Sequence, residues 1–321
     1  MKKFRKLITL LTVLALLGAC AAVSFAEEKT FKVALTPTDM KATYASWLAQ
    51  SFEEIAKEYP NIQLDIIDGQ NDVAHQMSVI EDCVTNGYDM IILHPVDPDA
   101  QATLVTSTIE AGTPMLIVNQ GTGGVEIVSN VDADPVEQGM IPALVAKDKI
   151  PEGGKVVVLL GPSGNVHSAG RLVGFEEYLF KARPDIEVLD TQIANWYKDQ
   201  AMSYMEDWLQ RFDQIDAVIS MNDAMALGAI EAARAAGRLE DMTYYGVDGL
   251  ADACLSIEAG ELTATCVQNA YAQAAKSMEI ADKVLTGEIE LERTLVPGEL
   301  IDPSNVADWI QIHTANGQIQ G

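Results

Sequence analysis

Short apolar runs rich in Val, Ile and Leu recur along the chain, and most are followed by a polar turn and a longer amphipathic stretch. The apolar runs predict strands at 32–36, 62–67, 90–95, 114–119, 126–131, 155–160, 186–193, 217–221, 243–247 and 262–267. The amphipathic stretches predict helices at 44–59, 73–87, 99–112, 135–148, 167–183, 199–212, 223–237, 250–260 and 270–286. Apolar strands that alternate with helices are typical of parallel sheets covered on both faces, so the pattern predicts a doubly wound α/β fold.

The predicted strands are too many for one compact sheet of ordinary size. A chain of 321 residues with 48% hydrophobic content is long enough for two lobes, each with its own sheet and core. No Pro- or Ser-rich linker separates two halves, so we expect short ordered crossings between the lobes at 129–134, 267–270 and 296–299. The expected N-terminal lobe is 30–131 plus 269–297, and the expected C-terminal lobe is 132–268 plus 298–321.

Residues 1–26 have the layout of an export leader. Basic residues crowd the first six positions and precede an apolar run from Leu7 to Leu17, which is too short for a stable membrane span. Two cleavage sites stay open: a lipoprotein box ending at Cys20, which would carry a lipid anchor, and leader-peptidase cleavage after Ala26. Both predict a mature protein outside the cytoplasmic membrane.

The charge of the chain argues against a polyanionic partner. The sequence has 21 basic and 47 acidic residues, and its formal net charge is -26. Removal of the leader takes away four basic residues and no acidic one, so 17 basic residues remain against 47 acidic ones and the net charge becomes −30. Nucleic acid is therefore not an expected partner, because binding to phosphates needs clusters of basic residues.

The sequence predicts no cofactor, no metal site and no catalytic residue. The histidines lack zinc spacing, and the segments at 161–165 and 121–126 fail the nucleophile-elbow and dinucleotide patterns at their last positions. Beyond the leader the cysteines are Cys83, Cys254 and Cys266, with no C-x-x-C motif. Buried free thiols are expected, and a Cys254–Cys266 disulfide stays open as the alternative.

Polar side chains follow almost every predicted strand. The segments after the strands are 36–39, 94–97, 119–120, 161–164, 195–197, 222–223, 247–249 and 268–269. Ligands of open α/β sheets bind just beyond the carboxyl ends of the strands, so these segments are candidates for a binding site. Amides, carboxylates, hydroxyls and aromatic rings together suit a neutral, hydroxyl-rich ligand better than a phosphate or a lipid.

Several segments resemble one family over about residues 31 to 310. They are IILHPVDPDA at 91–100, R-x-x-G-F at 171–175, MNDAMALGAI at 221–230, YGVDG at 245–249, IEAGELTATCVQ at 257–268 and ADKVLTGE at 281–288. The chain resembles the ribose-binding-protein-like solute-binding proteins of sugar ABC importers, which have the type I periplasmic-binding fold. Regulatory domains of the Lac-repressor family share this fold, but they follow a DNA-binding helix-turn-helix, whereas this chain begins with an export leader.

The resemblance implies a ligand cleft between two lobes. It places Arg171, Asn222, Asp248 and Gln268 in that cleft, with Trp196 as an aromatic that packs on the sugar ring and Tyr44 as a second stacking residue from the other lobe. Guanidinium, carboxylate and amide groups suit the ring and hydroxyl oxygens of a sugar, and aromatic rings suit its C–H face. At the 222–223 turn we expect Asn222 to contact the ligand and Asp223 to cap the helix that follows.

Two departures from the family leave the ligand's identity open. Relatives that bind ribose-type sugars carry an acidic residue and an Arg after the fourth strand, whereas this chain has Asn119 and Gln120, which serve either as ligand contacts or as a plain turn. The segment after the first strand also lacks the family's Asn-Pro-aromatic run.

The resemblance further implies that the protein is a monomer that captures a monosaccharide or a polyol-like molecule and delivers it to the permease of an ABC importer. A ligand-presenting sensor for a chemoreceptor or histidine kinase is the first alternative. A secreted hydrolase that pairs Asp248 with Asp39 or Asp97 is the second, and binding without catalysis is the expectation.

Overall fold

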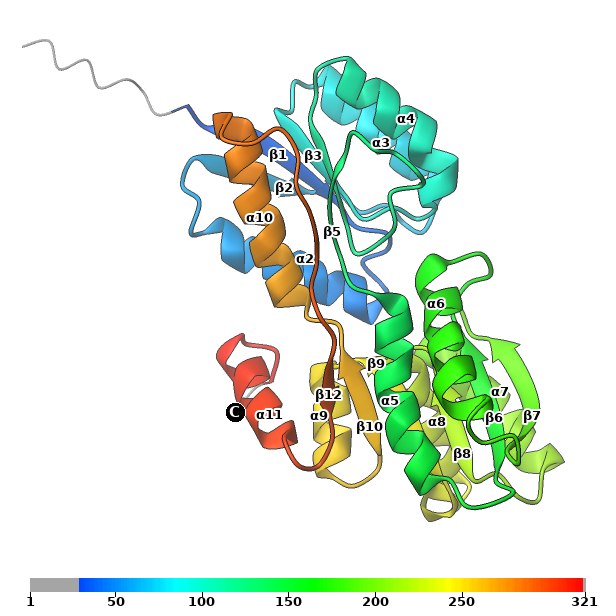
Figure 1. The fold of residues 1–321 in the computed structure, drawn as a ribbon. Helices are drawn as coiled ribbons and strands as arrows, with labels where there is room; N and C mark the ends of the chain where they lie inside the picture. The colour runs from blue at the N-terminus through cyan, green and yellow to red at the C-terminus, as the bar shows by residue number, and fades with distance from the viewer. Residues whose placement is uncertain (1–28, 320–321) are drawn as a thin grey trace, which may run out of the picture. The chain divides into compact units, whose positions relative to one another are not determined.

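The computed structural model describes residues 29–319, so the leader and the candidate anchor residue Cys20 lie outside the described residues. From Phe31 onward the chain forms one compact unit built on two six-stranded sheets, one in each lobe (Figure 1). Within 29–319 no helix is both long enough and apolar enough to cross a membrane.

The sheet of the N-terminal lobe has the strand order β11-β5-β4-β3-β1-β2, and all its neighbours are parallel. Its strands are β1 (Phe31–Thr36), β2 (Ile62–Ile66), β3 (Met90–Leu93), β4 (Met115–Val118), β5 (Ser129–Asp132) and β11 (Arg293–Leu295). Its helices are α2 (Thr43–Ala56), α3 (Val73–Thr85), α4 (Pro98–Glu110) and α10 (Ala270–Thr286). In Figure 1, α2 and α10 cover one face of this sheet and α3 and α4 cover the other.

Helices bury both faces of this sheet. Successive side chains of a strand point to opposite faces, so neighbouring residues of one strand enter two different cores. Val33 and Leu35 of β1 belong to the core cluster that contains residues of α2 and α10. Ala34, between them, belongs to a second cluster, with Ile80 of α3 and other residues of α3 and α4. The central strands β3 and β4 are accordingly apolar at every position, whereas β1, β2 and β5 also contain polar residues.

The sheet of the C-terminal lobe has the order β12-β10-β9-β8-β6-β7, and only β12 runs antiparallel to its neighbour. Its strands are β6 (Lys155–Leu160), β7 (Glu187–Ile193), β8 (Ala217–Ser220), β9 (Thr243–Asp248), β10 (Ala264–Val267) and β12 (Glu299–Ile301). Its α-helices are α5 (Pro135–Lys149), α6 (Val166–Phe175), α7 (Lys198–Arg211), α8 (Asp223–Ala235), α9 (Ala251–Glu258) and α11 (Val306–Ala315). Helix α6 continues as a π-helical turn, Glu176–Phe180, and a 3₁₀ turn spans Leu239–Asp241.

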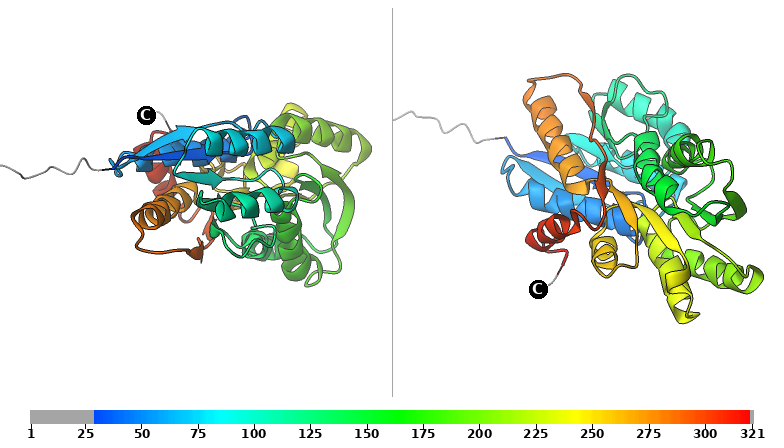
Figure 2. Two further views of the ribbon diagram at one scale, coloured as in Figure 1. Left: turned by 90° about the horizontal axis from the view of Figure 1, so that it is seen from above. Right: turned by 60° about the horizontal axis from the view of Figure 1, so that its bottom comes forward.

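The chain crosses between the lobes three times. It passes from β5 to α5, from β10 to α10 and from β11 to β12, and these segments run side by side between the lobes in Figures 1 and 2. The predicted fold class, two doubly wound parallel-sheet lobes joined by three crossovers, is confirmed.

Three elements near the C-terminus escaped the sequence pattern. Strands β11 and β12 have only three residues each, too few for a periodic signal, and α11 follows them. The thiols of Cys83, Cys254 and Cys266 are buried and free, as expected, and the alternative Cys254–Cys266 disulfide is absent.

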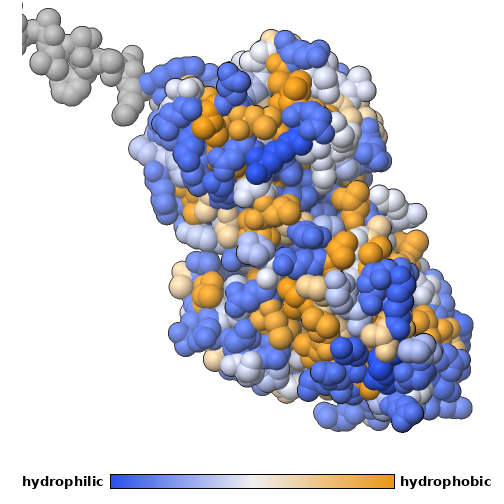
Figure 3. All heavy atoms as spheres, viewed as in Figure 1, coloured by the Kyte–Doolittle hydropathy of each residue, from blue (hydrophilic) through white to orange (hydrophobic). Residues whose placement is uncertain are grey.

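The face of the molecule shown in Figure 3 is mostly polar. On the face shown in Figure 3, hydrophilic residues cover most of each lobe, and apolar residues gather in smaller patches, several of them where the lobes meet. This distribution agrees with the excess of acidic residues in the sequence.

Candidate functional site

A cavity of about 570 Å³ lies between the lobes and is lined by residues of both. All eight residues that the sequence predicted for the site line this one cavity: Tyr44, Asn119, Gln120, Arg171, Trp196, Asn222, Asp248 and Gln268. They come from the ends of strands, from the segments that follow strands or from the first two turns of helices, where the fold brings the two sheets' carboxyl ends together. Their contact with a ligand remains a prediction.

Arg171 is the central cation of the site. It lies on α6, its side chain is 3% exposed, and its guanidinium donates to the Oε1 of Gln138 at 3.0 Å and the carbonyl of Met221 at 2.6 Å. It also donates to the Oε1 of Gln268, and its Nη1 lies 3.4 Å from the Oδ1 of Asp248. A guanidinium has five N–H groups, so these four contacts leave one N–H on Nη2 without a partner among residues 29–319.

The position of Arg171 depends on close packing of α6 against α5. A Cβ added at Gly139 of α5 would come within 2.0 Å of the carbonyl oxygen of Arg171, so only glycine permits this approach. The start of α6 is fixed by Asn165, whose side chain accepts hydrogen bonds from the backbone N–H groups of His167 and Ser168.

Asp248 offers an unpaired acceptor beside this cation. It ends β9, it is 2% exposed, and within the described part of the chain its Oδ2 has no hydrogen-bond partner. Burial raises the pKa of Asp248, and the adjacent charge of Arg171 opposes this shift and favours the carboxylate. Among the described residues, Arg171 therefore has one N–H without a partner and Asp248, whose Oδ1 lies 3.4 Å from Nη1, has one oxygen without a partner.

Backbone strain is concentrated around the cavity. Six described residues other than glycine have positive φ, and five of them line the cavity: Asn71, Asn119, Asn195, Trp196 and Asp248. Such conformations cost energy and persist at sites where the surrounding structure holds them for function. Strain of this kind supports the assignment of the cavity as the functional site.

Asn222 both caps a helix and lines the cavity. Its Oδ1 accepts from the N–H of Met225 at 2.9 Å, and its Nδ2 donates to the carbonyl of Trp196 at 3.3 Å. The prediction that Asp223 is the cap was wrong, because Asp223 is the first residue of α8 and its carboxylate points inward. That carboxylate accepts from the hydroxyl of Thr265 at 2.6 Å and from the N–H of Leu250 at 2.9 Å.

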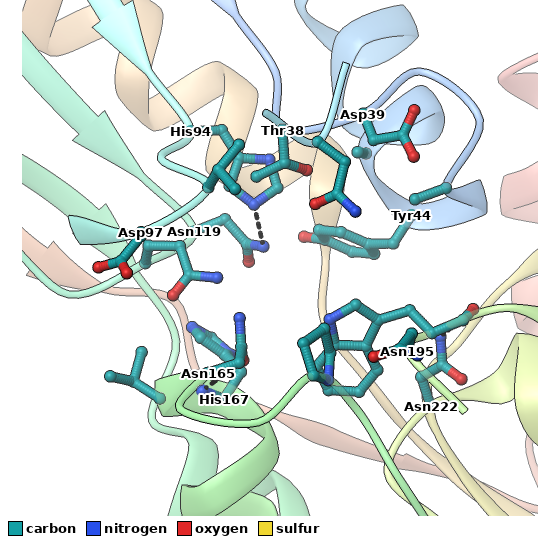
Figure 4. A pocket seen from close by; sticks show the side chains of 18 of the residues that line it. Thr38, Asp39, Tyr44, His94, Asp97, Asn119, Asn165, His167, Asn195 and Asn222 are labelled. Carbon is teal, nitrogen blue, oxygen red and sulfur yellow. Dashed lines mark hydrogen bonds between the residues drawn. The ribbon is translucent and has the colours of Figure 1, made fainter. Parts of the chain in front are cut away.

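Two aromatic residues reach the cavity from opposite lobes. Tyr44 in the first turn of α2 projects from the N-terminal lobe (Figure 4) and packs edge-on against Trp47, with ring centroids 5.7 Å apart. Trp196 follows β7 in the C-terminal lobe, and its indole fills the space left by Gly161, where an added Cβ would lie 2.2 Å from the ring. The guanidinium of Arg171 lies 5.6 Å from the centroid of the Trp196 ring.

Asn119 and Gln120 have different environments. The sequence left open whether they contact the ligand or form a plain turn. The Oδ1 of Asn119 accepts from the Nε2 groups of Gln268 and Gln273, and its Nδ2 lies 3.2 Å from the Nε2 of His94 (Figure 4). The Oε1 of Gln120 is buried without a partner within residues 29–319. Asn119 is thus part of a hydrogen-bond network, which a plain turn would not require.

Two histidines that the sequence prediction left out of the site residues line the cavity, one from each lobe. His94 follows β3, and burial, reinforced by His167, lowers its pKa to about 3, so it is neutral. His167 lies one helical turn before Arg171, and its Nε2 is 3.0 Å from the Oδ1 of Asp132 at the end of β5. The available signals were the position of His94 directly after a strand, in the candidate segment 94–97, and the proximity of His167 to Arg171 in the sequence, but a lone histidine is more often structural.

The three carboxylates considered for a hydrolase, those of Asp39, Asp97 and Asp248, line the cavity, and each already has a partner. The carboxylate of Asp39 accepts from the hydroxyl of Tyr197 and the backbone of Lys41, and that of Asp97 caps α4. Asp248 is paired with Arg171. Within 29–319 no cluster of His, Cys, Asp and Glu has the arrangement of a metal site.

Comparisons with known proteins agree with this architecture. Residues 33–289 match the model of a family described as "Periplasmic binding protein domain". A "Xylitol-binding protein" of Mycolicibacterium smegmatis is 32% identical over 85% of this chain and 77% of its own length. A "Ribose import binding protein" of Bacillus subtilis is 30% identical over 84% of this chain and 86% of its own length.

A solved structure has the same fold. An ABC transporter solute binding protein from Bacillus halodurans, with bound myo-inositol, superposes with a TM-score of 0.82 and 28% sequence identity. The alignment covers 89% of this chain and 99% of that one. The chain is an extracytoplasmic protein, and it belongs to the periplasmic binding protein domain family.

Proposed function

We propose that the protein captures a neutral polyhydroxylated molecule, a monosaccharide or a polyol, between its lobes and delivers it to an ABC importer. One observation carries this proposal: hydrogen-bonding groups and two aromatic residues from both lobes line a single cavity. The buried charge of Arg171 is compensated by Asp248, so the ligand is expected to carry no charge.

The unpaired groups of the cavity suit hydroxyls. Arg171 and Asp248 are in contact, and each has one unpaired group, so hydroxyls can accept from the free N–H of Arg171 and donate to the free oxygen of Asp248. Tyr44 and Trp196 offer apolar surfaces from opposite sides, which suits the C–H faces of a ring or chain. The names of the relatives support this class, since xylitol, ribose and myo-inositol are all uncharged and polyhydroxylated.

Closure of the lobes is the proposed output of binding. A ligand that bridges the lobes binds the closed form more tightly than the open form. To shift the ratio of closed to open protein from 1:99 to 99:1, the ligand must bind the closed form about 10⁴-fold more tightly. The importer then recognises the closed form. The name of the Bacillus subtilis relative supports import rather than sensing as the role.

A binding screen tests the proposal. The exported chain would be unfolded in urea, dialysed to remove bound metabolites and refolded before a thermal-shift screen. The screen compares xylitol, D-ribose and myo-inositol with phosphate, glutamate and lysine at equal concentrations, and calorimetry follows each hit. Stabilisation by at least one polyol or sugar and by none of the charged compounds is expected. Stabilisation by charged compounds alone would contradict the proposal.

A further inference from the structure

Gln138 lies outside the cavity but contacts two residues that line it. It is fully buried in the first turn of α5, directly after the first crossover. Its Oε1 accepts from the Nε of Arg171 at 3.0 Å, and its Nε2 donates to the Oε1 of Gln268 at 2.8 Å. It therefore ties the cation of the C-terminal lobe to a residue of the second crossover.

The direction of these hydrogen bonds is fixed by chemistry. A guanidinium only donates, so Arg171 must face the oxygen of Gln138 and the oxygen of Gln268. The nitrogen of Gln268 then faces Asn119 and donates to its oxygen. The nitrogen of Asn119 in turn donates to the Nε2 of His94, so the proton of the neutral His94 ring lies on Nδ1.

The result is a one-way chain of donors that starts in the C-terminal lobe and ends in the N-terminal lobe. Its steps run from Arg171 to Gln268, from Gln268 to Asn119 and from Asn119 to His94. Gln138 supports the first of these hydrogen bonds, because it makes hydrogen bonds with both Arg171 and Gln268.

We propose that Gln138 is a positioning residue that orients Arg171 and Gln268 toward the ligand and couples them to the opposite lobe. This inference rests on the proposed function, because orientation of the pair has its effect through ligand capture. The site requires one acceptor and one donor at the same position, and an amide supplies both. A carboxylate of the same shape supplies only the acceptor, and a thioether supplies neither in comparable strength.

Two substitutions in the full chain separate these contacts. Gln138→Glu keeps an acceptor for Arg171 and removes the donor to Gln268, whereas Gln138→Met removes both. Gln210→Glu, at an exposed position on α7, controls for the added charge.

Nuclear magnetic resonance on the ligand-free protein gives a readout that does not depend on the ligand. The Nε–H signal of Arg171, assigned through Arg171→Lys, should exchange slowly in the wild type and in Gln138→Glu and quickly in Gln138→Met. The ring nitrogens of His94 should show a neutral Nδ1–H tautomer at neutral pH in the wild type. Equal exchange of the Arg171 signal in all three proteins, or an Nε2–H tautomer of His94, would overturn the inference.

Calorimetry with xylitol, D-ribose and myo-inositol gives the second readout. Both Gln138 variants should bind the compound preferred by the wild type about tenfold or more weakly, the effect expected from losing hydrogen bonds around a charged group, and Gln210→Glu should bind it normally. Wild-type affinity in both Gln138 variants would overturn the inference. If none of the three compounds binds the wild type, the proposed function fails, and the exchange of the Arg171 signal alone decides the role of Gln138. If Gln138→Met does not fold, Gln138→Glu and the His94 tautomer decide it.

Discussion

The hydroxyl of Tyr197 donates a hydrogen bond of 2.6 Å to the Oδ2 of Asp39, and the two residues belong to different lobes. Tyr197 follows β7 and Asp39 follows β1, whereas the three crossovers leave from β5, β10 and β11. Strand β7 is at the far edge of its sheet from β10 and β12, and β1 is four places from β11 in the other sheet. The hydrogen bond therefore spans the cleft on the side away from the three crossovers. Opening of the lobes about the crossovers must break it.

Substitution of Tyr197 by Phe should weaken closure. Burial and the carboxylate of Asp39 raise the pKa of Tyr197 to about 12, so the hydroxyl keeps its proton and donates at neutral pH. Loss of a hydrogen bond to a charged acceptor should accelerate ligand dissociation about tenfold. Stopped-flow fluorescence checks this rate, with Tyr178→Phe on the exposed surface of the C-terminal lobe as the matched control. An unchanged dissociation rate would show that the contact does not stabilise the closed form.

Asp248→Ala should abolish ligand binding. The substitution removes the only carboxylate paired with Arg171 in the described chain, and it leaves both the guanidinium and the ligand's hydroxyls without their partner in a buried site. Asp248→Asn, which keeps the shape, should weaken binding by about a hundredfold, consistent with lost bonds to a charged group. The exposed Asp252→Asn on α9 should bind normally in the same calorimetric titration. Wild-type affinity in Asp248→Ala would remove this residue from the site.

The role of Trp196 can be tested without changing Trp196. Gly161→Ala adds a methyl group that would come within 2.2 Å of the indole, so the ring must shift from its place. We expect this variant to lose about tenfold in affinity, as Trp196→Ala should, because both remove the aromatic contact. Gly121→Ala adds its methyl group to open space and serves as the control. If Gly161→Ala and Trp196→Ala both bind like the wild type, the indole does not contact the ligand.

His94 should make the protein less stable in acid. Its pKa is lowered to about 3 in the folded protein from an ordinary value of 6.5, so below pH 6.5 the unfolded chain binds a proton that the folded chain does not. This contribution to stability is complete above pH 6.5 and is lost as the pH falls toward 3, and it amounts to about 3 kcal/mol between pH 7 and pH 4.5.

Urea unfolding of the wild type and of His94→Gln at both pH values isolates this contribution. The loss of unfolding free energy between pH 7 and pH 4.5 should be smaller in the variant. Asp223 acts in the opposite direction in both proteins, because burial raises its pKa to about 6 and its contribution to stability grows as the pH falls through 6. Equal losses in the wild type and the variant would contradict the neutral, buried state of His94.

The fold class could be predicted because most of the central strands are rich in apolar residues on both faces. In the runs 155–160 and 217–220 the only polar residues are the terminal Lys155 and Ser220, so the uninterrupted apolar stretch and its length identify each strand without tertiary information. Strand β11 could not be found in this way, because its three residues are held by pairing with β5 and not by an apolar pattern of their own.

The sequence could predict those residues of the candidate site that belong to a family motif or lie at the end of a strand. Arg171, Asn222 and Asp248 follow from the family motifs, and their common cavity follows from the rule for carboxyl ends of strands. Gln138 and the Tyr197–Asp39 contact could not be predicted, because each depends on segments that are distant in sequence and that only the folded lobes bring together.

A crystal structure of the protein with the tightest binder from the polyol and sugar panel tests the central claim most directly. We predict electron density for that compound in the cavity between the lobes, with hydroxyls within hydrogen-bond distance of Arg171 and Asp248 and with Tyr44 and Trp196 on opposite sides. Density at another surface, or a compound in the cavity that touches neither Arg171 nor Asp248, would contradict it.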